Sequence, residues 1–427
     1  MGLPGAVLMG LGSIVGTGLF VSLGIAAGVA GSGILLALPL AAMLALFNGL
    51  SSAQLAAAHP VSGGTYEYGY RFLNPTLGFA AGWMFLLAKG ASAATAALGL
   101  AGYLLLTLGL AEAVILRVAL AGGIVLVLTL LVAGGIRRSN RANTLVVGIT
   151  LLVFAFFLLA GLPQALTTFV GTALEGGVDG PAAGLTAAGP SALLHATALL
   201  FVAYTGYGRI ATLGEEVKDP ARTIPLAIWI TLGTVAFLYL GVAAVALGAL
   251  GPDGFARATA ETAAPLQAVA RELGTPGLPL LVALAAATAM VGVLLNLVLG
   301  LSRVALAMGR RGDLPGVLAR VEAESGSPRI AVAAVGAGIL ALVLLGDVRT
   351  TWPFSAFTVL IYYGITNLAA LRLPVEARRY PRWIPSLGLA ACLFLAFQVE
   401  VRVWVVGIAM LSSGLLLRGI FRALESH

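Results

Sequence analysis

The chain has 427 residues, of which 60% are hydrophobic and 10% are charged, and its mean hydropathy is +1.03. This composition excludes an ordinary water-soluble globular protein, in which about 25% of the residues are charged. The formal charge of +7 would favour a nucleic-acid partner in a soluble chain, but in a membrane protein the basic residues act as topology signals, so we expect no nucleic acid.

Apolar segments of membrane-spanning length follow one another along the whole chain. A transmembrane helix needs about 20 apolar residues. Twelve segments meet this requirement and predict an all-α polytopic membrane protein with a single transmembrane domain over residues 1–427. They lie near 3–29, 33–58, 76–108, 113–134, 142–163, 191–213, 223–249, 277–308, 330–346, 352–371, 383–399 and 402–421.

Glycines interrupt the first and the sixth of these segments. The stretch GSIVGTGLF occupies 12–20, and FVAYTGYGRIATLGEE occupies 201–216. Two glycine-broken helices at corresponding places are typical of an inverted repeat whose binding site lies at the breaks. We therefore predict two five-helix repeats, over about 3–163 and 191–371, followed by two additional helices within 383–421.

A break in a membrane helix exposes hydrogen-bonding groups that a continuous helix satisfies internally. The N–H groups at the start of the second half-helix suit a carboxylate, and the carbonyls that end the first half suit an ammonium or a small cation. Glycine also lets a ligand approach the backbone closely. The alternative is that Gly12 and Gly16, at a spacing of four, only pack against neighbouring helices. The second break favours a site for a zwitterion.

The basic residues divide unequally between the two sides of the membrane. With the N-terminus inside, most of the 24 Lys and Arg residues fall in cytoplasmic segments. The outer segments keep Arg117, Arg257, Arg271, Arg349 and Arg402. This asymmetry follows the positive-inside rule, and it predicts a cytoplasmic-membrane protein with both termini in the cytoplasm.

Two ionisable residues within predicted spans are candidates for function, because a charge at the bilayer centre costs about 3 kcal/mol or more. Lys89 is in the middle of the third span, where it would act as a proton carrier or as a structural charge facing carbonyls. Arg209 follows the second break and would form a cytoplasmic gate by pairing with Glu215, Glu216 or Glu67.

Catalytic and cofactor signals are absent from the sequence. The single cysteine, Cys392, allows neither an internal disulfide nor a cysteine metal site. No pair of histidines has metal-ligand spacing, no Ser-His-Asp arrangement can be assembled, and no phosphate-binding loop occurs. We therefore expect no metal, no cofactor and no enzyme activity, and any transport would be driven by a gradient or by exchange.

Four segments resemble signature segments of the amino acid-polyamine-organocation transporter superfamily. They are MGLGSIVGTGLFVS at 9–22, PVSGGTYEYGYRFLNPTLGFAAGW at 60–83, LFVAYTGYGRIATLGEEVKDPARTIPLAI at 200–228 and SRVALAMGRRGDLP at 302–315. The resemblance follows the order of the spans over nearly the whole chain. It implies the LeuT-type fold, with transport by alternating access to a site at the two breaks.

The resemblance also implies a set of substrate-binding residues. The substrate carboxylate would be held by the backbone N–H groups of Thr17 and Gly18, next to the turn at Gly16. The substrate amino group would meet the carbonyls of Ile14, Val202 and Thr205. The side-chain pocket would be shaped by Tyr204, Gly206 and Tyr207.

The chain departs from this family at the aromatic gate above the substrate. Val202 stands where many relatives carry an aromatic residue. Phe201 and Tyr207 are the predicted substitutes.

The coupling ion, H⁺ or Na⁺, stays open. Proton-linked relatives often carry a lysine midway along the fifth span, where this chain has Thr150. For Thr150 we favour a bond to the carbonyl one turn back. A sodium site would need two hydroxyls on the eighth span, but Thr288 and Ser302 are roughly four turns apart.

We predict a secondary active transporter of neutral amino acids, since the spans that would form the pocket carry no acidic residue except those near their cytoplasmic ends. The alternatives are a transporter of amines, polyamines or cationic amino acids, an amino acid exchanger, and a sensor that binds an amino acid without moving it.

Overall fold

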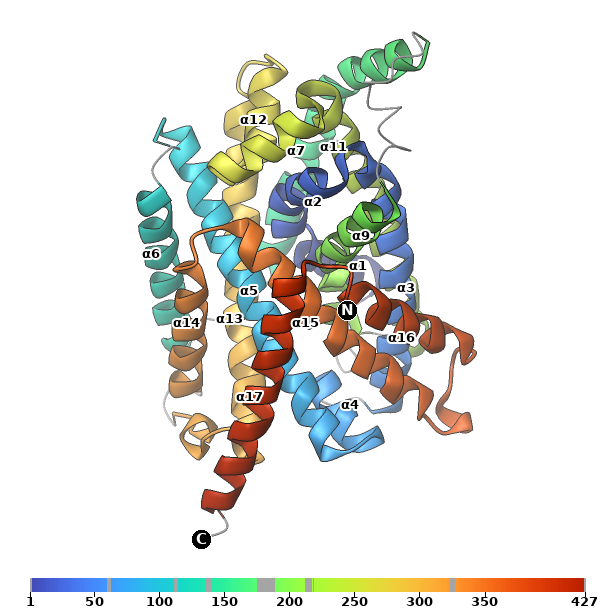
Figure 1. The fold of residues 1–427 in the computed structure, drawn as a ribbon, viewed down its shortest axis with the longest axis vertical. Helices are drawn as coiled ribbons and strands as arrows, with labels where there is room; N and C mark the ends of the chain where they lie inside the picture. The colour runs from blue at the N-terminus through green and yellow to red at the C-terminus, as the bar shows by residue number, and fades with distance from the viewer. Residues whose placement is uncertain are drawn as a thin grey trace.

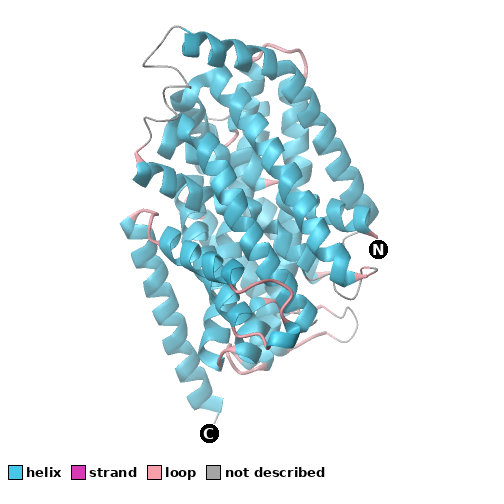
Figure 2. Ribbon diagram, turned by 90° about the vertical axis from the view of Figure 1, so that its right-hand side faces the viewer, coloured by secondary structure: helices cyan, strands magenta, loops and turns pink. Residues whose placement is uncertain are grey.

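The computed structural model describes residues 2–59, 63–110, 114–135, 140–174, 189–211, 217, 219–322 and 327–425. Within these ranges the regular elements are helices, and no strand occurs. Most helices run roughly along the long axis of the molecule, and their connections gather at its two ends (Figures 1 and 2).

Helices follow the predicted segments in chain order. The first broken segment contains α1 (Leu3–Ile14), the π-helical turn η1 (Gly18–Ser22) and α2 (Leu23–Ala30), and the second contains α9 (Pro190–Tyr204), the 3-10 turn η3 (Thr205–Tyr207) and α10 (Gly208–Ala211). The other segments correspond to α3 (Ile34–Ala58), α5 (Pro75–Thr107), α6 (Val114–Ala133), α7 (Asn140–Leu174), α11 (Pro220–Thr262), α13 (Leu278–Arg310), α14 (Arg329–Val343), α15 (Val348–Leu371), α16 (Trp383–Ala396) and α17 (Val401–Glu425). Two short helices lie between them, α4 (Thr65–Phe72) and α12 (Pro265–Glu272).

Length and hydropathy identify a polytopic membrane protein. In the described part of the chain, 8 helical segments are long and apolar enough to cross a membrane, and α1, α14 and α16 are shorter apolar helices. The figure of twelve crossings goes beyond this criterion and stays a prediction.

One predicted boundary was wrong: we expected the fifth span to end near residue 163, whereas α7 continues to Leu174. The seventh span was expected to end near residue 249, and the helical stretch of α11 that begins at Pro220 is interrupted at Gly251, whose φ is 66°, before a second helical stretch runs to Thr262. Glycine tolerates this positive φ, and Pro252, directly after it, restarts the helix because its fixed φ suits a first helical turn. The chain then enters α12 at the end of the molecule opposite α4 (Figure 1).

The helices pack as two groups. In one, α11 contacts α1, α2 and α3, and α9 contacts α2 and α3; in the other, α5, α6, α13 and α14 contact one another. Between the groups, α7 contacts α1, α11 and α13, and α15 contacts α3, α5 and α9. Each group combines predicted spans that are five apart in sequence, which is the grouping that an inverted repeat would produce.

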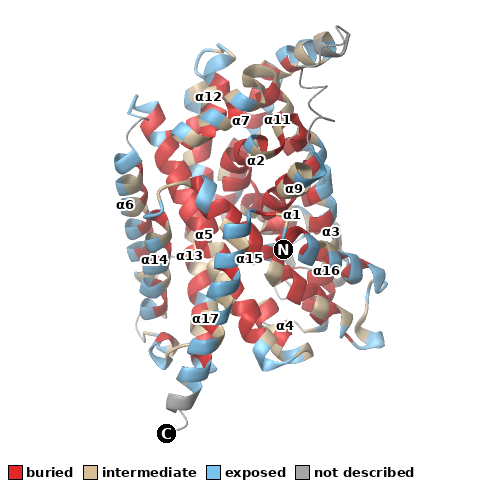
Figure 3. Ribbon diagram, viewed as in Figure 1, coloured by how far each residue is buried: buried red, intermediate tan, exposed pale blue. Residues whose placement is uncertain are grey.

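Burial increases from the periphery to the centre (Figure 3). The most apolar windows of α5 and α15 are 78% buried, whereas that of α17 is 17% buried. Large apolar side chains such as Ile115 and Phe237 are exposed at the outside. A surface of this kind suits lipid rather than water.

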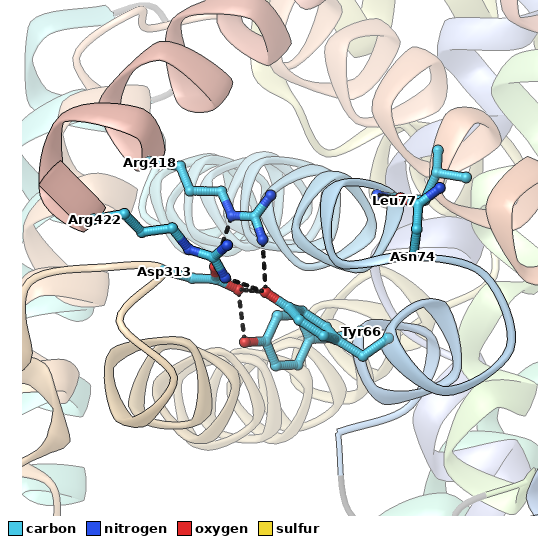
Figure 4. Close-up of polar contacts among 7 residues, drawn as sticks. Tyr66, Asn74, Leu77, Asp313, Arg418 and Arg422 are labelled. Carbon is cyan, nitrogen blue, oxygen red and sulfur yellow. Dashed lines mark hydrogen bonds and ion pairs between the residues drawn. The ribbon is translucent and has the colours of Figure 1, made fainter. Parts of the chain in front are cut away.

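A buried ion cluster joins α4, the loop after α13, and α17 (Figure 4). Asp313 is fully buried and accepts hydrogen bonds from the Tyr66 hydroxyl at 2.9 Å, from the Tyr70 hydroxyl, and from Arg418 Nε at 2.7 Å. Arg422 lies 3.2 Å from the same carboxylate. Burial, together with Asp313, raises the pKa of both tyrosines, so the two hydroxyls stay protonated and donate.

A second ion pair flanks this cluster. Arg311 lies over the rings of Tyr66 and Tyr70 and pairs with Glu67 of α4. The loop that contains Asp313 therefore connects α4 and α17, which are far apart in sequence. It also fixes one end of the group formed by α5, α6, α13 and α14.

Candidate functional site

The first predicted interruption is present in the structure. Helix α1 ends at Ile14, and Val15 is extended, with φ −73° and ψ 97°. The chain resumes as the π-helical turn at Gly18. Because the last carbonyls of a helix commonly lack an intrahelical donor, the end of α1 presents acceptors to groups outside the helix. The hydroxyl of Thr17, within the break, is buried without a hydrogen-bond partner.

The second interruption has a similar form. Helix α9 ends at Tyr204 and tightens into the 3-10 turn η3 before α10 begins at Gly208. A short 3-10 stretch inside a longer helix marks local strain or function. The break therefore falls at the GYG sequence of residues 206–208.

The two breaks pack directly against each other. A Cβ on Gly206 would lie 2.3 Å from the Ser13 carbonyl oxygen, and a Cβ on Gly18 would lie 2.7 Å from the Ala203 Cβ. Contacts are exchanged crosswise, since α1 contacts η3 and α9 contacts η1. Only glycine fits at either position without a shift of the backbone, so these glycines are needed for the approach of the two helices.

Tyr239 of α11 lies where the two breaks meet. Its buried hydroxyl is 3.2 Å from the carbonyl oxygens of both Ile14 and Ala203. No local sequence signal marks Tyr239, because it is one of several aromatic residues in an apolar helix and no spacing rule distinguishes it.

Lys89 of α5 also reaches the second break. Its Nζ donates to the Thr205 hydroxyl at 2.7 Å, and that hydroxyl donates to the Val202 carbonyl at 2.8 Å. From α15, the Tyr363 hydroxyl donates to the Thr205 carbonyl at 3.3 Å. The structure therefore brings Lys89 together with two of the residues predicted to line the substrate site.

Aromatic rings close the second break on the side of α15. Phe201 and Tyr207 both contact the Tyr363 ring, and each pair of ring centroids is 5.6 Å apart. All three side chains are buried. Both residues predicted to replace the missing aromatic gate thus meet at Tyr363, which the sequence analysis did not single out.

A small cavity lies between α1, α7 and α13. Its lining residues are Gly12, Val15, Val146, Val147, Thr150 and Ala289. The Thr150 hydroxyl is the only side-chain hydroxyl among these lining residues, and it donates to the Val146 carbonyl at 2.8 Å. Thr288 is exposed and donates to the Leu284 carbonyl within its own helix. The structure does not bring Thr288 to the cavity.

Comparison with known proteins shows which family this arrangement belongs to. The family model described as amino acid permease matches residues 5–418. The chain belongs to the amino acid permease family. A protein named as an uncharacterized transporter from Mycobacterium tuberculosis is 41% identical over 422 residues, which cover 99% of this chain and 91% of the relative.

Two further relatives carry substrate names. The branched-chain amino acid permease BcaP of Bacillus subtilis is 28% identical over 92% of this chain and 86% of its own length. Cationic amino acid transporter 4 of Mus musculus is 30% identical over 92% of this chain and 63% of its own length. The permease is therefore a multi-pass membrane protein of an amino acid transport family.

Helix α12 packs against the first break. Tyr103 of α5 donates to the Phe20 carbonyl at 2.8 Å and accepts from the Leu266 N–H of α12 at 3.3 Å. All three residues are fully buried, whereas Gly206 and Gly208 keep partial exposure. Helix α12 thus covers the first break.

Only part of the predicted charged gate lies within the residues that the structure describes. Arg209 is exposed on α10, and Glu67 pairs with Arg311. Glu215 and Glu216 lie outside the described residues. Over the described ranges, no group of three or more His, Cys, Asp or Glu residues is arranged to hold a metal ion.

Proposed function

We propose that this permease is a secondary active transporter of neutral amino acids in the cytoplasmic membrane, with both termini in the cytoplasm. The observation that carries the proposal is the packing of the two helix breaks against each other through Gly18 and Gly206. The substrate carboxylate binds the N–H groups of Thr17 and Gly18 beside the turn at Gly16. The substrate ammonium binds carbonyls at the ends of the two helices.

The ammonium acceptors are the carbonyls of Ile14, Val202 and Thr205, and the side-chain pocket is shaped by Tyr204, Gly206 and Tyr207. Phe201 closes the pocket together with Tyr207, because both rings contact Tyr363. In alternating access, the group α1, α2, α3, α9 and α11 moves against the group α5, α6, α13 and α14. Arg209 forms a cytoplasmic gate with Glu215 or Glu216.

A neutral substrate fits the charges at the site. Lys89 reaches the second break and carries a positive charge when it is protonated. A substrate with a positive side chain would be repelled by this ammonium at low dielectric. The alternative substrate class, cationic amino acids, is favoured by the name of the mouse relative.

For the coupling ion, the cavity between α1, α7 and α13 favours H⁺ over Na⁺. Thr150 supplies the one hydroxyl among its lining residues, and Thr288 faces away from it. A hard cation such as sodium requires several oxygen ligands. Lys89 is then the candidate proton carrier, since a buried lysine changes its charge readily.

The first test is ligand binding by detergent-purified full-length protein. A panel of the twenty amino acids with cadaverine and ethanolamine is measured by thermal shift, and the Gly18→Val variant is measured in parallel. The matched control is Gly233→Val, because Gly233 has nothing within 4 Å of an added Cβ. We expect stabilisation by a few neutral amino acids that is lost only in Gly18→Val. Stabilisation by amines alone, or equal stabilisation of both variants, would contradict the proposed site.

A second experiment separates transport modes in liposomes. Uptake of the stabilising amino acid is measured under a proton gradient, under a sodium gradient, and with unlabelled amino acid inside. Uptake driven by a proton gradient is the expected result. Uptake only against internal amino acid would identify an exchanger, and binding without flux would identify a sensor.

A further inference from the structure

The hydroxyl of Tyr239 joins the two helix breaks. It lies 3.2 Å from the carbonyl oxygen of Ile14, the last residue of α1, and 3.2 Å from that of Ala203, near the end of α9. Both carbonyls belong to the last turn of a helix, where carbonyls commonly lack an intrahelical donor. The Tyr239 hydroxyl of α11 is a donor to both of these carbonyls.

The single Tyr239 hydroxyl cannot donate a full hydrogen bond to both the Ile14 and the Ala203 carbonyl. It has a single proton, and both distances of 3.2 Å exceed the usual value of about 2.7–2.8 Å for an O–H···O bond. The proton is therefore shared, and each carbonyl is only weakly satisfied. The phenolic oxygen itself still has lone pairs that can accept a hydrogen bond.

The hydroxyl also lies beside the proposed carboxylate site. A Cβ on Gly18 would be 2.9 Å from the Tyr239 oxygen, so this oxygen touches the backbone whose N–H is proposed to bind the carboxylate. An α-amino acid carries its ammonium and its carboxylate on the same carbon atom. A substrate held at Gly18 therefore has its ammonium within reach of Tyr239 and the two carbonyls.

We propose that the Tyr239 oxygen is a direct ligand of the substrate α-ammonium. The ammonium has three N–H donors, and the Ile14 carbonyl, the Ala203 carbonyl and the phenolic oxygen offer three acceptors. The Ala203 carbonyl and the phenolic oxygen take the place of the Val202 and Thr205 carbonyls, because those two already accept the N–H groups of Thr205 and Gly208. On binding, Tyr239 keeps its proton, donates it to one carbonyl, and accepts one N–H from the substrate. A buried ammonium needs all of its donors paired, so this set makes the site selective for a protonated amine next to a carboxylate. The inference rests on the proposed function.

The test compares two ligand types on the full-length protein in detergent. Dissociation constants are measured for L-alanine, L-serine and L-leucine, and for the 2-hydroxy acids with the same side chains, in the wild type and in Tyr239→Phe. A hydrogen bond to a charged group converts to a loss of about tenfold or more in affinity. We expect this loss for the amino acids and less than about twofold for the hydroxy acids, which lack an ammonium. Tyr380→Phe makes the same chemical change in the loop between α15 and α16 and should alter neither.

The outcomes are distinguishable. Equal weakening of both ligand types would show that Tyr239 only holds the helices together, and no weakening would show that it does not contact the ligand; either result overturns the inference. Failure of the wild type to bind any of the three amino acids would instead contradict the proposed function, and the inference with it.

A second measurement covers the case in which Tyr239→Phe does not fold. 3-Fluorotyrosine incorporated at position 239 keeps the hydroxyl and provides a single ¹⁹F resonance. We expect L-alanine to shift this resonance by more than L-lactate at equal occupancy. Equal shifts with the two ligands would overturn the inference.

Discussion

Gly206→Ala places one methyl group between the two helix breaks. The added Cβ would lie 2.3 Å from the Ser13 carbonyl oxygen and 2.5 Å from the Ser13 carbonyl carbon. Ordinary contact begins at 3.4 Å, so the two backbones must separate by about 1.1 Å, the difference between 3.4 and 2.3 Å. No rotamer change relieves this clash, because both partners are backbone.

Separation on this scale affects binding more than folding. Overpacking of this kind costs about 1–3 kcal/mol of stability. A hydrogen bond to the substrate with a usual length of about 2.8 Å is lost when it is lengthened by about 1 Å. Each lost bond to a charged group weakens binding by about tenfold or more. We therefore expect the dissociation constant for neutral amino acids to rise by at least about tenfold, with a modest fall in the melting temperature.

The assay is thermal shift and equilibrium binding in detergent, with Gly233→Ala as the matched control. Gly233 is helical and has nothing within 4 Å of an added Cβ. Alanine is the better helix former by about 1 kcal/mol, so the control should bind as the wild type does and melt at the same temperature or higher. Gly206→Ala protein that binds amino acids within about twofold of the wild type would refute the reasoning.

Three further predictions follow from the charged groups and the substrate termini. Asp313→Asn removes the carboxylate that pairs with the buried Arg418, so it should cost about 3–5 kcal/mol of stability and lower the melting temperature clearly; Glu400→Gln, in an exposed pair, should leave it unchanged, and similar melting of the two variants would contradict the cluster's role. Lys89→Met removes the ammonium that donates to Thr205 and should abolish proton-driven uptake while sparing exchange across the liposome membrane; equal loss of both activities would argue against a proton carrier. Methyl esters and amides of the transported amino acid should fail to compete for binding, because the N–H groups of the first break need an anion; competition equal to that of the free acid would place the carboxylate elsewhere.

The helix pattern was accessible from sequence because lipid imposes it. Every backbone polar group in a spanning segment must be paired internally, so long apolar runs can only be helices. The two breaks were visible because glycine and hydroxyl residues cluster where lipid-facing helices normally carry large apolar side chains. The continuation of α7 to Leu174 was not visible, because a proline such as Pro163 usually ends or kinks a helical pattern.

The candidate site was predictable only where the backbone determines it. Gly18, Gly206 and Thr205 lie in the breaks themselves, where Gly18 packs on Ala203 of α9 and Gly206 packs on Ser13 of α1. Tyr239 and Tyr363 enter the site from helices without any local signal, and they are placed by the packing of the helix groups. Such tertiary contacts join residues that are far apart in sequence, and no periodicity rule identifies them.

The buried ion cluster was missed for a related reason. The sequence GDLPGV reads as a turn, and turn residues are usually exposed. Asp313 is instead buried, because α4 and α17 cover the loop and supply the hydroxyls and guanidinium groups that stabilise its charge. The loop's role depends on helices that lie far away in the chain.

The most direct test of the central claim is an experimental structure of the protein with its stabilising amino acid bound. We predict ligand density between the two breaks, with the carboxylate at the N–H groups of Thr17 and Gly18 and the ammonium at the Ile14 carbonyl and the Tyr239 hydroxyl. Ligand density anywhere else, with the Gly18–Ala203 contact still closed, would contradict the account.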